Sequence, residues 1–210
     1  MDFQLSEEHR LIQETARRIA KEKIAPRAAE LDVSGEYPHD IFDAFKETGL
    51  TGLTIPQQYG GSGAGMLALA LAVEEVAKYC CASGLMLLLS ALPSQPVMIG
   101  GDERQKNWIG EGIASGSMKG AFCLTEPYVG SDASNLETRA VRDGDDYVLS
   151  GEKMYISGGT VADYAIAFAR TDGTPGPKGI SAFIVPTDTP GFRVAGQDRK
   201  MGVRGVPTAD

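Results

Sequence analysis

The chain is poor in cysteine, histidine and aromatic residues. Its 210 residues include 3 cysteines, 2 histidines and 1 tryptophan, and aromatic residues make up 7%. Cys80 and Cys81 are adjacent and Cys123 lies far along the chain, so the three form neither a disulfide framework nor the ligand spacing of a metal site. His9 and His39 stand far apart, without a cysteine or carboxylate cluster at metal spacing. We therefore expect no metal site, and reduced thiols in a cytoplasmic compartment.

Basic charge and long apolar runs are also scarce. The chain carries 20 basic against 28 acidic residues, a formal charge of -8, which repels phosphate backbones in the absence of a basic patch and excludes nucleic acid as a partner. The longest apolar run, around residues 85–89, is interrupted by Ser90 and Pro93, well short of the roughly 20 residues that cross a bilayer. The amino terminus has neither the basic segment nor the apolar run of a signal peptide. We expect no membrane span and a protein that stays where it is made.

Apolar residues make up 42% of the chain, enough to bury a core in one large or two modest domains. From residue 5 to about residue 114 the pattern is helical, with Ile12, Ala16 and Ile19 on one helix face. Beyond Gly116 short alternating or apolar runs are separated by turn residues. The sequence predicts an α+β protein, with an all-α helical domain over residues 1–115 and an antiparallel, barrel-like β domain over residues 116–210.

Caps and turns predict where individual elements begin and end. Ser6 is a helix N-cap, Gly49 closes a helix, and Asp102 starts a surface helix that fades at residues 115–116. The other helices are expected at residues 39–48, 66–79 and 82–92, and the strands at residues 138–142, 147–150, 164–170, 180–186 and 191–195.

Two segments of the chain indicate a flavin site. Residues 121–132, Ala-Phe-Cys-Leu-Thr-Glu-Pro-Tyr-Val-Gly-Ser-Asp, run from a buried-strand pattern into a Pro and Gly turn. Such a turn places unpaired backbone N–H groups and two hydroxyls on one rim, where they suit a ring carbonyl and a diphosphate. Residues 153–157, Lys-Met-Tyr-Ile-Ser, place Tyr155 and Ser157 two residues apart, on one face of an expected strand. Tyr155 can then stack while Ser157 donates a hydrogen bond.

These two segments resemble the flavin-binding signature of the acyl-CoA dehydrogenase family, T-E-P-x-x-G-S-D followed by K-x-[WY]-I-[ST]. The resemblance extends to residues 59–61, 143–147 and 200–204 and so covers nearly the whole chain. It implies FAD as cofactor, an acyl-CoA thioester as substrate and desaturation to an enoyl-CoA. It also implies an electron-transferring flavoprotein as acceptor and a homo-oligomer for the complete protein. Residues 205–210 end without a terminal helix or closing strand, so we expect a cut chain that lacks the family's C-terminal helical domain.

The resemblance also implies the role of each site residue. The strand end at Phe122, Leu124 and Thr125 would meet the flavin ring, Gly130 and Ser131 would approach the diphosphate, and Ser131 would also touch the acyl-CoA. Tyr155 replaces the family's usual Trp and Ser157 its usual Thr; both changes keep the role and leave the substrate subclass open. The expected cofactor-binding set is Phe122, Cys123, Leu124, Thr125, Gly130, Ser131, Tyr155, Ile156 and Ser157.

No catalytic residue is expected within the chain. Glu126 lies inside the motif, but the resemblance places the base beyond residue 210, and we expect Glu126 to fix its loop by hydrogen bonding. Glu74 and Glu75 point about 100° apart on a helix, and we expect a solvated or capping role for them. For the motif itself, the alternative is an ordinary strand that ends in a turn, with Asp132 as a local cap.

Two alternative functions stay open. One is a non-catalytic module or subunit that binds a flavin or CoA ester and needs a partner chain for the helical half. The other keeps the fold but lets oxygen reach the reduced flavin, as in an oxidase or a monooxygenase.

Overall fold

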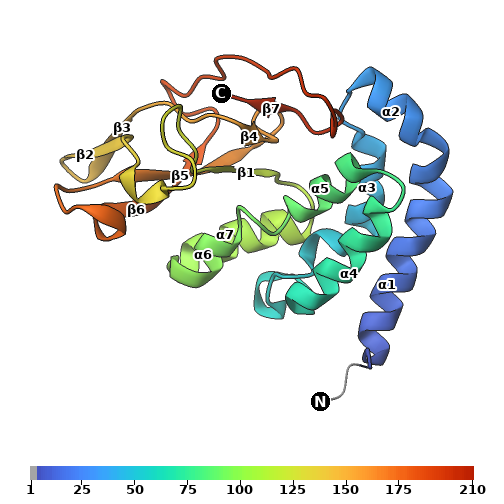
Figure 1. Ribbon diagram of the computed structural model, residues 1–210. Coiled ribbons are helices and arrows are strands. Elements are labelled where there is room, and N and C mark those ends of the chain that lie inside the picture. The colour runs from blue at the N-terminus through green and yellow to red at the C-terminus, as the bar shows by residue number, and fades with distance from the viewer. Residues whose placement is uncertain (1–3) are drawn as a thin grey trace. The chain divides into compact units, whose positions relative to one another are not determined.

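The computed structural model of the chain describes residues 4–210. Backbone contacts divide it into two compact units, shown as ribbons in Figure 1. One unit holds the chain up to Lys119 together with Arg199–Pro207, and the other holds Gly120–Asp198 and Thr208–Asp210. The segment Arg199–Pro207 therefore leaves the β unit and returns to the helical unit before the chain re-enters the β unit.

The first and the last helix of the helical unit each begin at a capping residue. The Ser6 hydroxyl accepts a hydrogen bond from the His9 amide at the start of the first helix. At the last helix the Asp102 carboxylate accepts from the Gln105 amide at 2.8 Å, and the Gln105 side chain accepts from the Asp102 amide at 3.0 Å, a complete capping box. The helices are α1 (Glu7–Ile19), α2 (Ala28–Ser34), α3 (His39–Glu47), α4 (Gly65–Ala77), α5 (Cys81–Leu88), α6 (Gln95–Gly100) and α7 (Glu103–Ala114).

The core of the helical unit lies where α1, α3, α4 and α5 pack together. Helices α1 and α4 run side by side, as Figure 1 shows. Ala16 on α1, Phe45 on α3 and Leu69 on α4 are fully or almost fully buried. Val206 from the returning segment is 0% exposed in the same core. No helix within residues 4–210 is long and apolar enough to cross a bilayer.

The β unit is built on a mixed sheet with β5 at its centre. β5 pairs in parallel with β1 and with β2 and in antiparallel with β6, while β2 and β3 form an antiparallel hairpin. A separate antiparallel pair is formed by β4 and β7. The strands are β1 (Gly120–Cys123), β2 (Arg139–Asp143), β3 (Asp146–Ser150), β4 (Ile156–Ser157), β5 (Tyr164–Arg170), β6 (Ile180–Pro186) and β7 (Thr208–Ala209).

A helical region followed by a β domain is confirmed, but the sheet corrects two details. It is open and mixed in the described chain, not an antiparallel barrel, because β1 and β2 reach β5 by crossover connections, not by hairpins alone. Residues 191–195 lie outside the strands, whereas Thr208–Ala209 forms β7 although no closing strand was expected. A strand of two residues carries no periodicity that a sequence can reveal.

Candidate functional site

The two halves of the sequence motif lie side by side in the β unit. The Met154 amide donates a hydrogen bond to the Thr125 carbonyl at 2.9 Å, and Lys153 Nζ donates to the Leu124 carbonyl at 3.2 Å. These contacts fasten the segment before β4 to the segment that follows β1. Residues that are about 30 positions apart in sequence therefore share one edge of the fold.

Glu126 binds the motif together from its interior. Its side chain is buried, and Lys153 Nζ lies 2.8 Å from its Oε1. The backbone amides of Glu137 and Thr138 donate to the two carboxylate oxygens at 2.5 Å and 3.0 Å. One carboxylate thus joins the segment after β1, the residues before β2 and the segment before β4.

These contacts set the protonation state of Glu126. Burial alone would raise its pKa, but the hydrogen bonds from Lys153, Thr138 and Glu137 outweigh burial and lower the pKa to about 2. Burial lowers the pKa of Lys153, and the adjacent Glu126 carboxylate opposes that shift. A carboxylate that is ionised and already holds three donors is a poor proton acceptor. The prediction that Glu126 fixes the loop by hydrogen bonding is confirmed.

The loop after Glu126 is a tight turn that ends in exposed residues. Together with Thr125, Tyr155 and Ser157, its residues Gly130 and Ser131 are called the rim below. Glu126 and Val129 exchange backbone hydrogen bonds of 3.0 Å and 3.1 Å, which turns Tyr128 outward. Gly130 and Ser131 follow, both exposed, and no hydrogen bond of their amides or of the Ser131 hydroxyl occurs within residues 4–210. Asp132 accepts hydrogen bonds from the next residues of the loop, Ser134 and Asn135, so the local cap is present as well as the rim.

The side chains of β1 alternate between the two faces of the sheet. The centroids of the Phe122 ring and of the Phe168 ring on β5 lie 5.0 Å apart. Cys123 is buried in a cluster with Ile156 and Ala165. Burial raises the pKa of the Cys123 thiol to about 11, and the nearby Lys153 ammonium opposes that shift. The expected cofactor-binding residues therefore fall on two faces, with Cys123 and Ile156 on the buried one.

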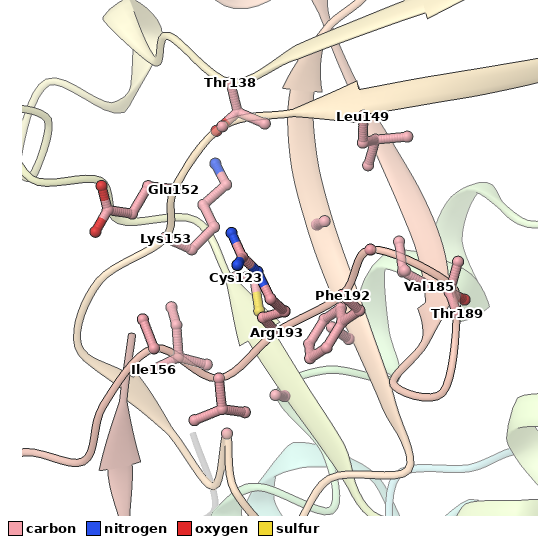
Figure 2. A pocket seen from close by; sticks show the side chains of 18 of the residues that line it. Cys123, Thr138, Leu149, Glu152, Lys153, Ile156, Val185, Thr189, Phe192 and Arg193 are labelled. Carbon is pink, nitrogen blue, oxygen red and sulfur yellow. The ribbon is translucent and has the colours of Figure 1, made fainter.

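A pocket of about 990 Å³ opens on the Cys123 face of the sheet. Figure 2 shows Cys123, Lys153, Phe192 and Arg193 among the side chains that line it. Phe122, Leu124, Thr125, Gly130, Ser131, Tyr155 and Ser157 are not part of its lining. The pocket and the exposed rim are therefore two different features of the β unit.

Tyr155 departs from its expected conformation. It lies outside a strand, because β4 begins at Ile156, and its φ of 60° is in the left-handed region, which is unusual for an aromatic residue. Its side chain is 63% exposed. The expectation that Tyr155 and Ser157 share one strand face is therefore wrong, because a left-handed residue breaks the alternation of a strand. Tyr155 is nevertheless exposed and Ser157 half-buried at the end of the motif.

A residue that the sequence did not single out holds Tyr155. The Asp210 Oδ1 atom accepts a hydrogen bond from the Tyr155 amide at 3.0 Å, across 55 positions of the chain. Asp210 directly follows β7, whose two residues pair with Ile156 and Ser157. Because no strand was expected there, no signal in the sequence pointed to this contact.

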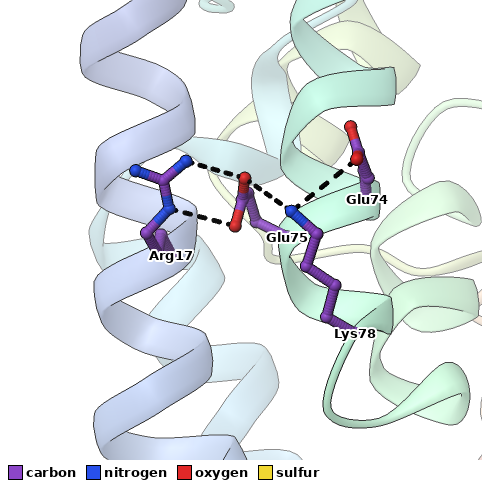
Figure 3. A network of polar contacts seen from close by, with 4 residues as sticks. All are labelled: Arg17, Glu74, Glu75 and Lys78. Atoms are coloured by element: carbon purple, nitrogen blue, oxygen red, sulfur yellow. Dashed lines mark hydrogen bonds and ion pairs between the residues drawn. The ribbon is translucent and has the colours of Figure 1, made fainter.

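Glu75 is the second buried carboxylate, and Figure 3 shows its partners. Arg17 on α1 donates to it from Nε at 3.1 Å and from Nη2 at 2.9 Å, and Lys78 Nζ lies 3.0 Å away. The Arg17 hydrogen bonds lower the pKa of Glu75 to about 2, against burial and with help from Lys78. The expected solvated or capping role is wrong for Glu75, which joins two helices, whereas Glu74 is exposed.

Within residues 4–210, no group of three or more His, Cys, Asp and Glu side chains could hold a metal ion. What the β unit offers is the exposed Tyr155, the partly exposed Thr125 and Ser157, and the exposed Gly130 and Ser131 with free backbone amides. Such a rim can bind a flat ligand with polar edges and an anionic arm.

Family models match both units of the fold. The acyl-CoA dehydrogenase N-terminal domain matches residues 6–117, and the acyl-CoA dehydrogenase middle domain matches residues 121–210. The chain belongs to the acyl-CoA dehydrogenase family.

Individual relatives agree with the family models. The probable acyl-CoA dehydrogenase YngJ of Bacillus subtilis is 42% identical over all of this chain and 56% of its own length. Acryloyl-CoA reductase (NADH) of Anaerotignum propionicum is 40% identical over all of this chain and 54% of its own length. The chain thus spans about half the length of the curated relatives it matches.

Solved structures share the fold over a similar span. Butyryl-CoA dehydrogenase from Megasphaera elsdenii superposes with a TM-score of 0.93 at 37% identity, covering 100% of this chain and 56% of that one. A chain from a structure described as electron transferring flavoprotein of Acidaminococcus fermentans gives a TM-score of 0.95 at 40% identity, covering 100% and 55%. A glutaryl-CoA dehydrogenase from Mycobacterium smegmatis in complex with FADH2 gives 0.88 at 32% identity, covering 98% and 52%.

Proposed function

We propose that the chain binds FAD at the rim of its β unit and is part of an enzyme that desaturates an acyl-CoA thioester to an enoyl-CoA. The observation that carries this proposal is the joining of the two motif halves through Met154, Lys153 and Glu126. It is supported by membership of the family and by a relative in complex with FADH2.

The rim residues fit the parts of a flavin nucleotide. Thr125 and Ser157 are half-buried and carry hydroxyls that can donate to the polar edge of the ring, and the exposed Tyr155 can pack beside it. Gly130 and Ser131 offer free amides and a hydroxyl for the diphosphate, and an added Cβ at Gly130 would meet nothing within 4 Å. In this proposal Ser131 also touches the acyl-CoA.

The remaining residues of the expected set divide by depth. Phe122 and Leu124 are half-buried at the strand end and can border the ring. Cys123 and Ile156 are buried. We therefore propose that their side chains pack beneath the rim and that only their backbone contributes to the flavin site.

When bound, the flavin supplies a hydride acceptor for the β-carbon of the acyl chain. The residues of this chain hold the cofactor and leave the ring accessible from the rim. Glu126 already holds three donors and is a poor base, and we propose that the proton-abstracting carboxylate lies outside residues 4–210, as the resemblance to the family implies. We further propose an electron-transferring flavoprotein as the acceptor of the electrons and a homo-oligomer as the assembled form.

The proposal is tested by titrating the chain with FAD and following flavin fluorescence and the visible absorption band. We expect saturable binding that weakens about tenfold in Thr125→Val and in Ser157→Ala, since each removes one donor to the ring. The control is Thr160→Ala, an exposed hydroxyl outside the rim, which should leave the affinity unchanged. Equal affinity of all four proteins, or no binding by the unaltered chain, would contradict the proposal.

Enoyl-CoA reduction is a second candidate, favoured by the 40% identity to acryloyl-CoA reductase (NADH). The two directions use the same site. Because the base is placed outside residues 4–210, the assembled enzyme is used: anaerobic addition of acyl-CoA to its oxidised form bleaches the flavin if desaturation is favoured. Reoxidation of the chemically reduced flavin by enoyl-CoA, without bleaching by acyl-CoA, would favour the reductase.

A further inference from the structure

The conformation of Tyr155 is imposed by its surroundings. A φ of 60° is rarely adopted by an aromatic residue, because the side chain crowds the backbone. Tyr155 as a whole is 63% exposed, so burial of its side chain does not account for the conformation. The following residues, Ile156 and Ser157, are held in β4, and the backbone must therefore turn at Tyr155.

The carboxylate of Asp210 is the contact that fixes this turn. Its Oδ1 accepts the Tyr155 N–H at 3.0 Å, so the donor of the left-handed residue is satisfied from outside its own segment. Asp210 is itself held by its main chain, since its amide donates to the Gly196 carbonyl at 3.2 Å and its carbonyl accepts from the Ala195 amide at 2.6 Å. The carboxylate is thus presented from a fixed backbone.

A second observation shows how closely β7 supports the same turn. Ala209 pairs with Ile156, and a Cβ built on Gly159 would lie 3.2 Å from the Ala209 Cβ. The segment from Tyr155 to Gly159 is therefore held at both of its ends, by the hydrogen bond to Asp210 at one end and by close approach to Ala209 of β7 at the other.

We propose that Asp210 is a positioning residue for the flavin site: its carboxylate holds Tyr155 in the left-handed conformation and thereby presents the Tyr155 ring at the rim. The inference rests on the proposed function, because the rim is where the flavin is placed. Asp210 acts through Tyr155 and touches neither flavin nor substrate in this account.

The first arm of the test needs no flavin. Amide hydrogen exchange and backbone chemical shifts of Tyr155 are measured by NMR in the unaltered chain, Asp210→Ala and Asp210→Asn. Asparagine keeps the Oδ1 acceptor and alanine removes it. We expect the Tyr155 amide to exchange at least tenfold faster in Asp210→Ala, with a shift change at Tyr155, and to stay within about threefold of the unaltered rate in Asp210→Asn. Unchanged exchange in Asp210→Ala, or equal behaviour of the two variants, would overturn the proposal.

The second arm measures FAD. Asp210→Ala is expected to weaken FAD binding about tenfold and to alter the visible band of the bound flavin, and Asp210→Asn is expected to restore both. The control, Asp188→Ala, removes an exposed carboxylate of the same unit and should change neither. A loss of affinity that Asp210→Asn fails to restore would contradict positioning through the acceptor oxygen.

A third variant keeps the proposal testable if Asp210→Ala does not fold. Tyr155→Gly removes the ring and adopts a positive φ without strain, so we expect a folded chain whose affinity for FAD drops. An affinity equal to that of the unaltered chain would show that the Tyr155 ring is not part of the rim and would overturn the proposal. If the unaltered chain binds no FAD, the proposed function fails, and the exchange arm still decides whether Asp210 positions Tyr155.

Discussion

The buried pair of Glu126 and Lys153 gives the sharpest prediction, because both motif halves depend on it. Glu126→Gln keeps the shape and the acceptor oxygen but removes the charge that faces a Lys153 side chain only 12% exposed. The carboxyl titrates at about 2 in the folded chain against 4.5 for the ordinary group, which by linkage corresponds to about 3 kcal/mol of stability near neutral pH. Breaking one partner of a buried pair has a similar cost, about 3–5 kcal/mol.

We therefore expect Glu126→Gln to lower the free energy of unfolding by about 3 kcal/mol at pH 7. The measurement is urea unfolding followed by circular dichroism and by hydrogen exchange of the β1 amides, which reports the β unit directly. Because the pKa of Glu126 is lowered by folding, the ionised group stabilises the chain above pH 4.5 and loses that effect as the pH falls toward 2. The difference between the unaltered chain and Glu126→Gln should shrink over the same range.

Glu152→Gln is the matched control, since Glu152 is the exposed carboxyl next to Lys153 in sequence; it should cost less than about 0.5 kcal/mol. Adding Lys153→Met to Glu126→Gln should recover part of the loss, because no buried charge is then left unpaired. The reasoning is refuted if Glu126→Gln and Glu152→Gln unfold alike, or if the loss caused by Glu126→Gln is unchanged between pH 7 and pH 3.

Three further predictions concern other parts of the chain. Glu75→Gln should lower the melting temperature in thermal unfolding at pH 7, and the difference should fade as the pH drops from 4.5 toward 2, because folding lowers the pKa of Glu75 to about 2. The buried Cys123, with its pKa raised to about 11, should resist iodoacetamide at pH 8 in the folded chain while the exposed Cys81 reacts, as mass spectrometry of tryptic peptides will show. Gly61→Ala should greatly reduce the yield of folded protein, judged by circular dichroism, because its Cβ would lie 2.0 Å from the Ile55 carbonyl oxygen.

Local signals in the sequence predicted much of the fold. The caps at Ser6 and Asp102 are present, and β5 and β6 begin and end at the expected residues, because capping and strand patterns depend on near neighbours. The parallel pairing of β1 with β5 was not predicted. Pairing between distant segments depends on how the chain crosses over, and the strand pattern of a single segment does not specify its partner.

The same difference between local and long-range information applies to the motif and to the residues that hold it in place. Glu126 could be assigned to loop fixing because its setting before a proline is visible in the sequence, whereas the burial of Glu75 depends on Arg17, 58 positions away. Tyr155 shows both sides of the distinction. Its residue type and its place in the motif are local information, but its left-handed backbone is held by Asp210 from 55 positions further on. A local motif can therefore indicate which side chains form the rim, while the direction in which they point is decided by strand pairing between β4 and β7. For this reason substitutions in β7, outside the sequence motif, should disturb the rim as much as conservative changes inside it.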